Sequence, residues 1–117
     1  MPLCEKVTVE IFEEKTEVSV CHCSRCRKWT AGPFFSIFIG KKENFKLVGE
    51  QFLKTYHFSS ESERAFCKEC GSVIYWKNEQ DAQYSFNAEL FPTLVNGYEI
   101  KKEYYLENKP NYYNLSK

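Results

Sequence analysis

The feature that most constrains this 117-residue chain is the spacing of its six cysteines. In chain order they are Cys4, which stands alone, then Cys21, Cys23 and Cys26 in CHCSRCRK, and Cys67 and Cys70 in FCKECGS. Cysteines so close in sequence pair poorly as disulfides, because the backbone between them is too short for the preferred sulfur dihedral, whereas their thiolates can converge on one tetrahedral ion. The spacing therefore predicts metal ligands, with zinc as the first expectation.

Composition and charge narrow the class of protein. The length predicts one domain over residues 1–117, small enough for a metal to help stabilise it. Sixteen basic residues balance sixteen acidic ones, so no excess positive field attracts nucleic acid or anionic lipid. The N-terminal run MPLCEKVTVEIFEE lacks the features of a signal peptide, and no stretch has the length of a membrane span. We expect a cytoplasmic protein, where close cysteines more often bind metal or react than form structural disulfides.

Alternation of apolar and polar residues predicts a mainly β fold. Val7, Val9 and Ile11 would lie on one face of a first strand, and residues 18–20 continue the alternation into CHCSRCRK. The charged segment 13–15 between them suggests a hairpin turn, which would bring Cys4 and Cys21 to the same end of a sheet.

The middle of the chain reads as a series of short strands. Strand-like runs occupy residues 33–39, 52–58, 72–76 and 82–86, separated by glycines and polar clusters. Only residues 41–45 and 88–90 suggest helical turns, and neither is long enough to organise the fold. We therefore expect an all-β architecture of short antiparallel strands.

The segment FCKECGS has the pattern of a zinc knuckle. Two sulfurs grip the ion, and Gly71 permits a backbone conformation that a Cβ would resist. A redox motif has the same spacing, but it would be followed by a helix, whereas here the strand-like SVIYW comes next, which favours zinc. Cys4 is the natural third ligand, and the fourth stays open.

The segment CHCSRCRK places three thiolates within six residues. Three protein ligands with an exchangeable fourth position are typical of catalytic zinc, and such a centre would deprotonate an incoming thiol near neutral pH. Arg25, Arg27 and Lys28 would lie beside the sulfurs. They would offset the negative charge, or bind a substrate carboxylate, or be solvated side chains that only favour thiolates.

The order of these motifs resembles the glutathione-dependent formaldehyde-activating enzyme family, which has the Mss4-like zinc fold. The matching segments are PLCEKV, CHCSRCRK, NFKLVGE, SSESERAFCKECGS and EYYLENKPNYY, so the resemblance covers most of the chain. It implies short antiparallel strands organised around two zinc sites. By motif position, the structural site would use Cys4, Cys67 and Cys70, and the catalytic site would use Cys21, Cys23 and Cys26.

The chain departs from the family pattern at its start. Where the family has two cysteines followed by glycine, this sequence has Pro2, Cys4 and Glu5, so the structural site lacks one thiolate. Water could complete that site, and so could the α-amine of Pro2 if Met1 is removed. A weakly held or lost ion is the other alternative.

The resemblance implies addition of glutathione to formaldehyde to give S-hydroxymethylglutathione, a carbon–sulfur lyase reaction run in reverse. Neither histidine is an obvious general base: His22 is expected to face solvent or to support the site from outside the ligand shell, and His57 to be packed or at the surface. The tyrosine-rich tail, residues 98–113, would cover a substrate cleft, fill the core or form a dimer contact.

Two other functions remain open. One is a non-catalytic zinc module that binds a protein partner, and the weaker one is a nucleic-acid-binding zinc domain, which the zero net charge disfavours. The thiol substrate, glutathione or another small thiol, and the choice between monomer and homodimer are also open.

Overall fold

A computed structural model describes residues 3–13, 15, 17–91 and 99–115 of the chain. The strands are β1 (Thr8–Ile11), β2 (Glu17–Cys21), β3 (Phe34–Gly40), β4 (Phe45–Val48), β5 (Leu53–Phe58), β6 (Ser62–Cys67), β7 (Val73–Asn78), β8 (Gln83–Asn87) and β9 (Glu99–Tyr104). The helices are α1 (Ser24–Thr30) and the 3-10 turns η1 (Lys42–Asn44), η2 (Glu50–Phe52), η3 (Ala88–Leu90) and η4 (Leu106–Asn108).

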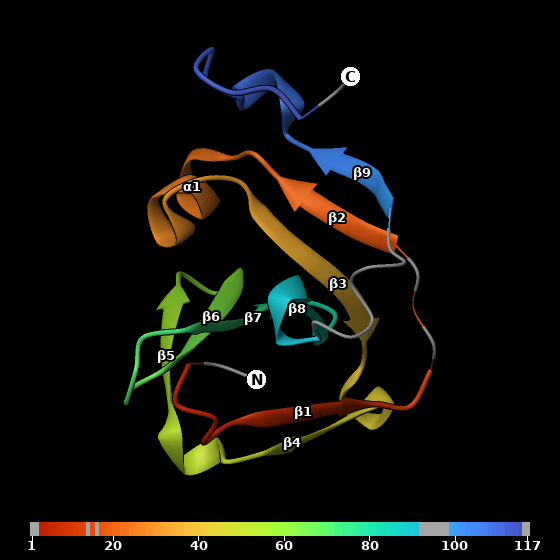
Figure 1. Cartoon of the computed structure of the whole chain (residues 1–117), viewed down its shortest axis with the longest axis vertical. Coiled ribbons are helices and arrows are strands. Elements are labelled where there is room, and N and C mark those ends of the chain that lie inside the picture. The colour runs from red at the N-terminus through yellow and green to blue at the C-terminus, as the bar shows by residue number, and fades with distance from the viewer. Residues whose placement is uncertain (1–2, 14, 16, 92–98, 116–117) are drawn as a thin grey trace.

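The strands form a large mixed sheet and a separate ribbon. The seven-stranded sheet has the order β5-β6-β7-β8-β3-β2-β9, and β1 pairs with β4 in the two-stranded ribbon. Neighbours in the large sheet are antiparallel except β2 and β9, which run parallel. In Figure 1 the ribbon crosses the lower part of the molecule, while α1 lies at the upper left beside the ends of β2 and β3. The expectation of a mainly β fold is confirmed.

Most predicted elements are present with shifts of one or two residues. The runs at 33–39, 52–58, 72–76 and 82–86 correspond to β3, β5, β7 and β8, and the two expected helical turns are η1 and η3. Sequence patterns missed β4, β9 and the helix α1, and β6 was not among the strand-like runs. With seven residues, α1 is the longest helix in the described part of the chain, where no helix has the length and apolarity to cross a membrane.

The predicted hairpin of residues 7–11 and 18–20 is wrong. Both segments are strands, but β1 pairs with β4 in the ribbon, and β2 lies between β3 and β9 in the large sheet. Alternation shows that one face of a strand is buried without showing which strand lies beside it. As a result Cys4 and Cys21 belong to different cysteine groups and not to one end of a shared hairpin.

Aromatic rings join the ribbon to the large sheet. Phe45 of β4 packs edge-on against Tyr84 and Phe86 of β8, with ring centroids 4.9 and 4.8 Å away, and Tyr75 of β7 extends the cluster. Phe86 is completely buried. This cluster holds β1 and β4, and therefore the Cys4 segment that precedes β1, against the sheet that carries Cys67.

Truncation of Phe86 should destabilise the fold far more than truncation of an exposed phenylalanine. Phe86→Ala leaves a cavity in the aromatic cluster, so we expect a loss of about 3 to 5 kcal/mol in the free energy of unfolding. Phe38 of the adjacent β3 is 49% exposed, and Phe38→Ala is the matched control, with an expected loss below about 1 kcal/mol. Urea denaturation of both variants measures the difference; equal losses would contradict the core described here.

Candidate metal centres

Three sulfurs from CHCSRCRK converge at the end of β2. The Sγ atoms of Cys21, Cys23 and Cys26, the Cys21 group, all lie within 4.8 Å of one another, and the Cys21 and Cys23 sulfurs are 3.5 Å apart. A tetrahedral zinc with bonds of about 2.3 Å separates its sulfur ligands by roughly 3.8 Å. The donors are soft thiols at the right spacing, so this group fits a zinc ion. Among the described residues, no histidine, aspartate, glutamate or further cysteine joins the three.

The Cys21 group is shaped by the start of α1. Cys21 is the last residue of β2, Cys23 caps the helix, and its sulfur accepts a hydrogen bond from the backbone N–H of Cys26 at 3.4 Å. Cys26 is buried in the first turn of the helix. A thiolate at a helix N-terminus is stabilised by the positive end of the helix dipole, so strand, cap and helix together gather the sulfurs.

Hydrogen bonding within the Cys21 group gives the thiols of Cys21 and Cys26 different pKa values. The hydrogen bond from Cys26 is the largest cause that lowers the pKa of Cys21 to about 6, and the same contact with Cys21, followed by burial, raises the pKa of Cys26. Without metal, these contacts favour ionisation of Cys21 over ionisation of Cys26. A metal that binds all three thiolates must displace the proton of Cys26, so its affinity should fall as pH falls.

The remaining three cysteines form a second group from two distant segments. The sulfurs of Cys4, Cys67 and Cys70, the Cys4 group, lie within 4.8 Å of one another, with Cys4 and Cys67 3.4 Å apart. All six cysteines of the chain are free thiols. This group also fits zinc by donor type and spacing, and no fourth His, Cys, Asp or Glu from the described residues joins it. Pro2, considered above as a ligand, lies outside the described residues.

The turn between β6 and β7 has the geometry of a zinc knuckle. Gly71 adopts a φ of +81°, as expected for this position, and its N–H donates to the Cys67 carbonyl at 2.7 Å. The Ser72 hydroxyl accepts from the Leu3 N–H at 3.1 Å and lies 3.2 Å from the Cys70 sulfur. Ser72 therefore ties the Cys4 segment to the knuckle, and its hydrogen bond is the main cause that lowers the pKa of Cys70 to about 6.

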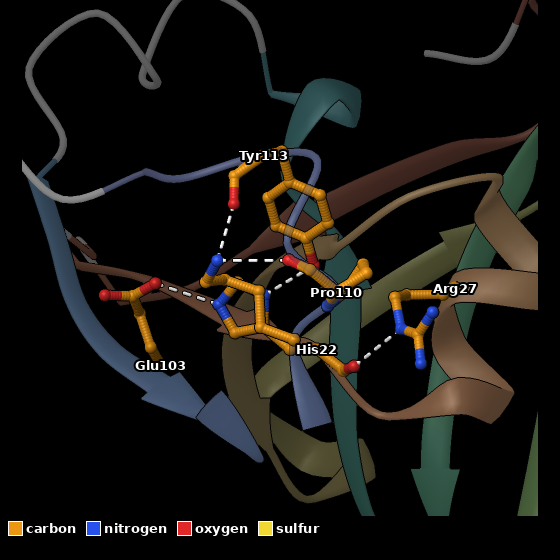
Figure 2. A network of polar contacts seen from close by, with 6 residues as sticks. His22, Arg27, Glu103, Pro110 and Tyr113 are labelled. Atoms are coloured by element: carbon orange, nitrogen blue, oxygen red, sulfur yellow. Dashed lines mark hydrogen bonds and ion pairs between the residues drawn. The ribbon is translucent and has the colours of Figure 1, made fainter. Parts of the chain in front are cut away.

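His22 lies between two cysteines of the Cys21 group but points away from them into the protein. Of the two alternatives expected for His22, exposure to solvent is wrong because the side chain is completely buried, whereas a supporting position outside the ligand shell agrees with its contacts. Its Nε2 lies 2.8 Å from a carboxylate oxygen of Glu103 on β9, and its Nδ1 lies 2.7 Å from the Tyr113 hydroxyl (Figure 2). Since the carboxylate can only accept, Nε2 donates to it, and in the neutral ring Nδ1 accepts from Tyr113.

Backbone contacts complete the environment of His22. Its N–H donates to the Tyr104 carbonyl at 2.9 Å, and its carbonyl accepts from Nε of Arg27 at 2.9 Å (Figure 2). The Tyr113 ring stacks on the imidazole with centroids 5.5 Å apart. Through these contacts of His22, β9 and the C-terminal segment hold the loop that carries the Cys21 group in place. Sequence reasoning placed Glu103 and Tyr113 in the aromatic tail but missed their contact with His22, because they lie 81 and 91 residues from it.

The cations beside the cysteines are not all available to the sulfurs. The exposed Arg25 pairs with Glu61 at 3.3 Å and covers the Phe58 ring, and Arg27 binds the His22 carbonyl. Lys28 is exposed. The cation that sequence reasoning missed is Arg64 of β6, which is 7% exposed and whose charge contributes to lowering the pKa of Cys21.

Two further features lie outside both cysteine groups. His57 on β5 is half-exposed and pairs with Glu63 at 3.2 Å, in keeping with the expectation of a surface position. A pocket of about 630 Å³ is lined by residues that include Trp29, Phe34, Ser72 and Asn87, but by no cysteine. Its lining includes the carboxylate of Glu89, but among the described residues the groups of three possible metal ligands are the two cysteine groups.

Tyr113→Phe should destabilise the chain although it removes only one hydroxyl. The change leaves Nδ1 of the buried His22 without its partner, so we expect a loss of about 1 to 2 kcal/mol in the free energy of unfolding. Tyr112→Phe is the matched control at the neighbouring position, where the side chain is 76% exposed, and should change stability by less than about 0.5 kcal/mol. Denaturant titration tests the pair, and two indistinguishable variants would refute the contribution of this hydrogen bond.

Comparison with known proteins places these centres in a family. The family model described as glutathione-dependent formaldehyde-activating enzyme matches residues 2–107. An uncharacterized lyase of Schizosaccharomyces pombe is 29% identical over 115 residues, covering 97% of this chain and 82% of that protein. A crystal structure of a Rhodobacter sphaeroides protein is similar with a TM-score of 0.58 at 18% identity, over 83% of this chain and 89% of that one, and this likeness supports the fold alone. Because the family model spans nearly the whole chain, the protein belongs to the glutathione-dependent formaldehyde-activating enzyme family.

Proposed function

We propose that this chain is a zinc-dependent carbon–sulfur lyase that joins a small thiol, glutathione in the first instance, to formaldehyde. The observation that carries the proposal is the convergence of Cys21, Cys23 and Cys26 within 4.8 Å, with no fourth ligand among the described residues. In this proposal the Cys21 group holds the catalytic metal and the Cys4 group holds a structural one. Family membership and the lyase name of the yeast relative support the reaction class.

The residues of the Cys21 group would act by holding a metal with one position left for substrate. Bound there, zinc would lower the pKa of an entering thiol so that it is a thiolate at neutral pH. The thiolate sulfur then attacks the carbonyl carbon of formaldehyde, the C–S bond forms, and the C=O π electrons pass to oxygen, which takes a proton from water. The product is the S-hydroxymethyl thiol.

The structure restricts which residues can take the thiol proton. Both ring nitrogens of His22 are occupied, one by Glu103 and the other by Tyr113, so His22 has no free site for a proton from the substrate. His57 is paired with Glu63 on a strand at the edge of the sheet. The thiol proton therefore leaves to solvent, and His22 acts only by holding the ligand loop in place.

One observation favours a non-catalytic zinc module as the second candidate. No cysteine lines the pocket of about 630 Å³, as would be expected if the metal served structure and the pocket a separate ligand. A partner protein would then be the binding target.

We also propose that the chain forms one domain over residues 1–117 and works in the cytoplasm, where a reducing environment keeps its six thiols free.

Zinc content should identify the two centres and separate the two candidates. Protein purified without chelators should carry about two zinc ions per chain, and Cys23→Ser should lose one of them because it removes a ligand of the Cys21 group. Ser24→Ala, at the adjacent exposed position, is the matched control and should keep both ions. Glutathione should change the X-ray absorption signature of zinc in the control but not in Cys23→Ser.

The reaction itself is checked by NMR exchange spectroscopy of glutathione with formaldehyde. Wild type and Ser24→Ala should accelerate adduct formation over the uncatalysed rate, whereas Cys23→Ser should not. A single ion that survives Cys23→Ser and ignores glutathione would eliminate the lyase and leave the zinc module.

A further inference from the structure

Arg64 is a buried cation packed against α1, the helix that carries Cys26. It projects from β6 and is 7% exposed. Its Nη1 donates to the Ser62 hydroxyl at 3.3 Å, and its guanidinium lies 5.3 Å from the centroid of the Trp29 ring. Trp29 is on α1, one turn after Cys26, so the helix that carries the buried ligand also covers Arg64.

The charge of Arg64 is not balanced by any acidic side chain that the structure describes. Arg25 pairs with Glu61, and the charged contacts of the described residues assign no carboxylate to Arg64. Its Nε–H is buried without an acceptor. A guanidinium so far removed from water requires an anion nearby, because burial of an unpaired charge costs several kcal/mol.

The Cys21 group can supply that anion, because Trp29, which Arg64 contacts, lies one turn after Cys26 on α1. Three thiolates carry three negative charges, of which a bound dication would cancel two. A thiolate substrate would add one more. Arg25, which lies between Cys23 and Cys26, contacts the Phe58 ring and pairs with Glu61, so the turn that leads into β6 lies against the segment that carries the sulfurs.

We propose that Arg64 is the counter-cation of the Cys21 group, and that it offsets the negative charge that the ligand thiolates and a thiolate substrate bring together. This inference rests on the proposed metal centre at Cys21, Cys23 and Cys26. Arg64 is then a positioning residue that acts through charge, and its contact with Trp29 holds the guanidinium where that charge is needed. The cations adjacent in sequence cannot replace it, because Arg25 and Lys28 are exposed and Arg27 binds the His22 carbonyl.

Zinc affinity of the Cys21 group tests the proposal without an assay of activity. Metal-free protein is titrated with zinc against a chromogenic chelator, and Cys23→Ser shows which of the two constants belongs to the Cys21 group. Arg64→Gln should weaken that constant about tenfold or more while leaving the constant of the Cys4 group unchanged. Arg64→Lys keeps the charge and should remain within about threefold of wild type. Lys77→Met removes a positive charge from the adjacent strand β7 and should leave both constants unchanged.

The possible results test the role of Arg64 separately from the proposed metal centre. Equal zinc affinity in Arg64→Gln and wild type would overturn the role of Arg64 and leave the metal centre standing. A folded Arg64→Lys that loses affinity tenfold would also overturn it, and this variant decides the matter if Arg64→Gln does not fold. A wild-type protein that leaves Cys21, Cys23 and Cys26 without zinc would overturn the proposed metal centre and the inference together.

Discussion

Thiolates held within a few ångströms repel one another, and the chain meets this constraint at two places. A sulfur that ionises beside another raises the cost of the next ionisation, so such a group needs a metal, shared protons or nearby cations. The Cys21 group has a helix N-terminus and the buried Arg64 beside it, whereas the Cys4 group has Ser72 and the backbone of the knuckle. These surroundings bring the sulfurs together and lower the free-energy cost of placing negative charge on them.

The two groups are held by different kinds of scaffold. The Cys4 group joins an N-terminal segment to a tight turn, and the aromatic cluster around Phe45 holds the two parts against each other. Its members Cys4 and Cys70 are partly open to solvent. The Cys21 group instead lies where β2 passes into α1, with Cys26 buried. In the proposed function, the strand-to-helix junction suits chemistry that requires fixed geometry, and a knuckle that holds the Cys4 segment suits a stabilising ion.

The parallel pairing of β2 with β9 connects the ligand loop to the end of the chain. It places Tyr104 opposite Cys21 and carries the following segment past His22, where Tyr113 stacks on the imidazole (Figure 2). The Nζ of Lys109 donates to the Tyr113 carbonyl at 2.6 Å and fixes that segment in turn. Tyr113 and Lys109 lie beyond residue 107, where the match to the family model ends, whereas Glu103 and Tyr104 lie within it, so the contacts of His22 come from both parts.

The sequence alone showed that Cys21, Cys23 and Cys26 belong together, as do Cys67 and Cys70, because ligand spacing is a local property that survives any choice of strand partner. Cys4 was added to the second group by motif order, since 63 residues separate it from Cys67. The sequence also placed β3, β5, β7 and β8, whose apolar runs are local too. Strand pairing was decided only in the tertiary structure: an alternating strand exposes the same pattern to any partner, so β1 was assigned to β2 when it pairs with β4. The helix α1 was missed because a cysteine cap resembles no ordinary helix start. Arg64, Glu103 and Tyr113 reach the ligand loop across the fold, and burial and charge at such long range follow from packing that no short segment encodes.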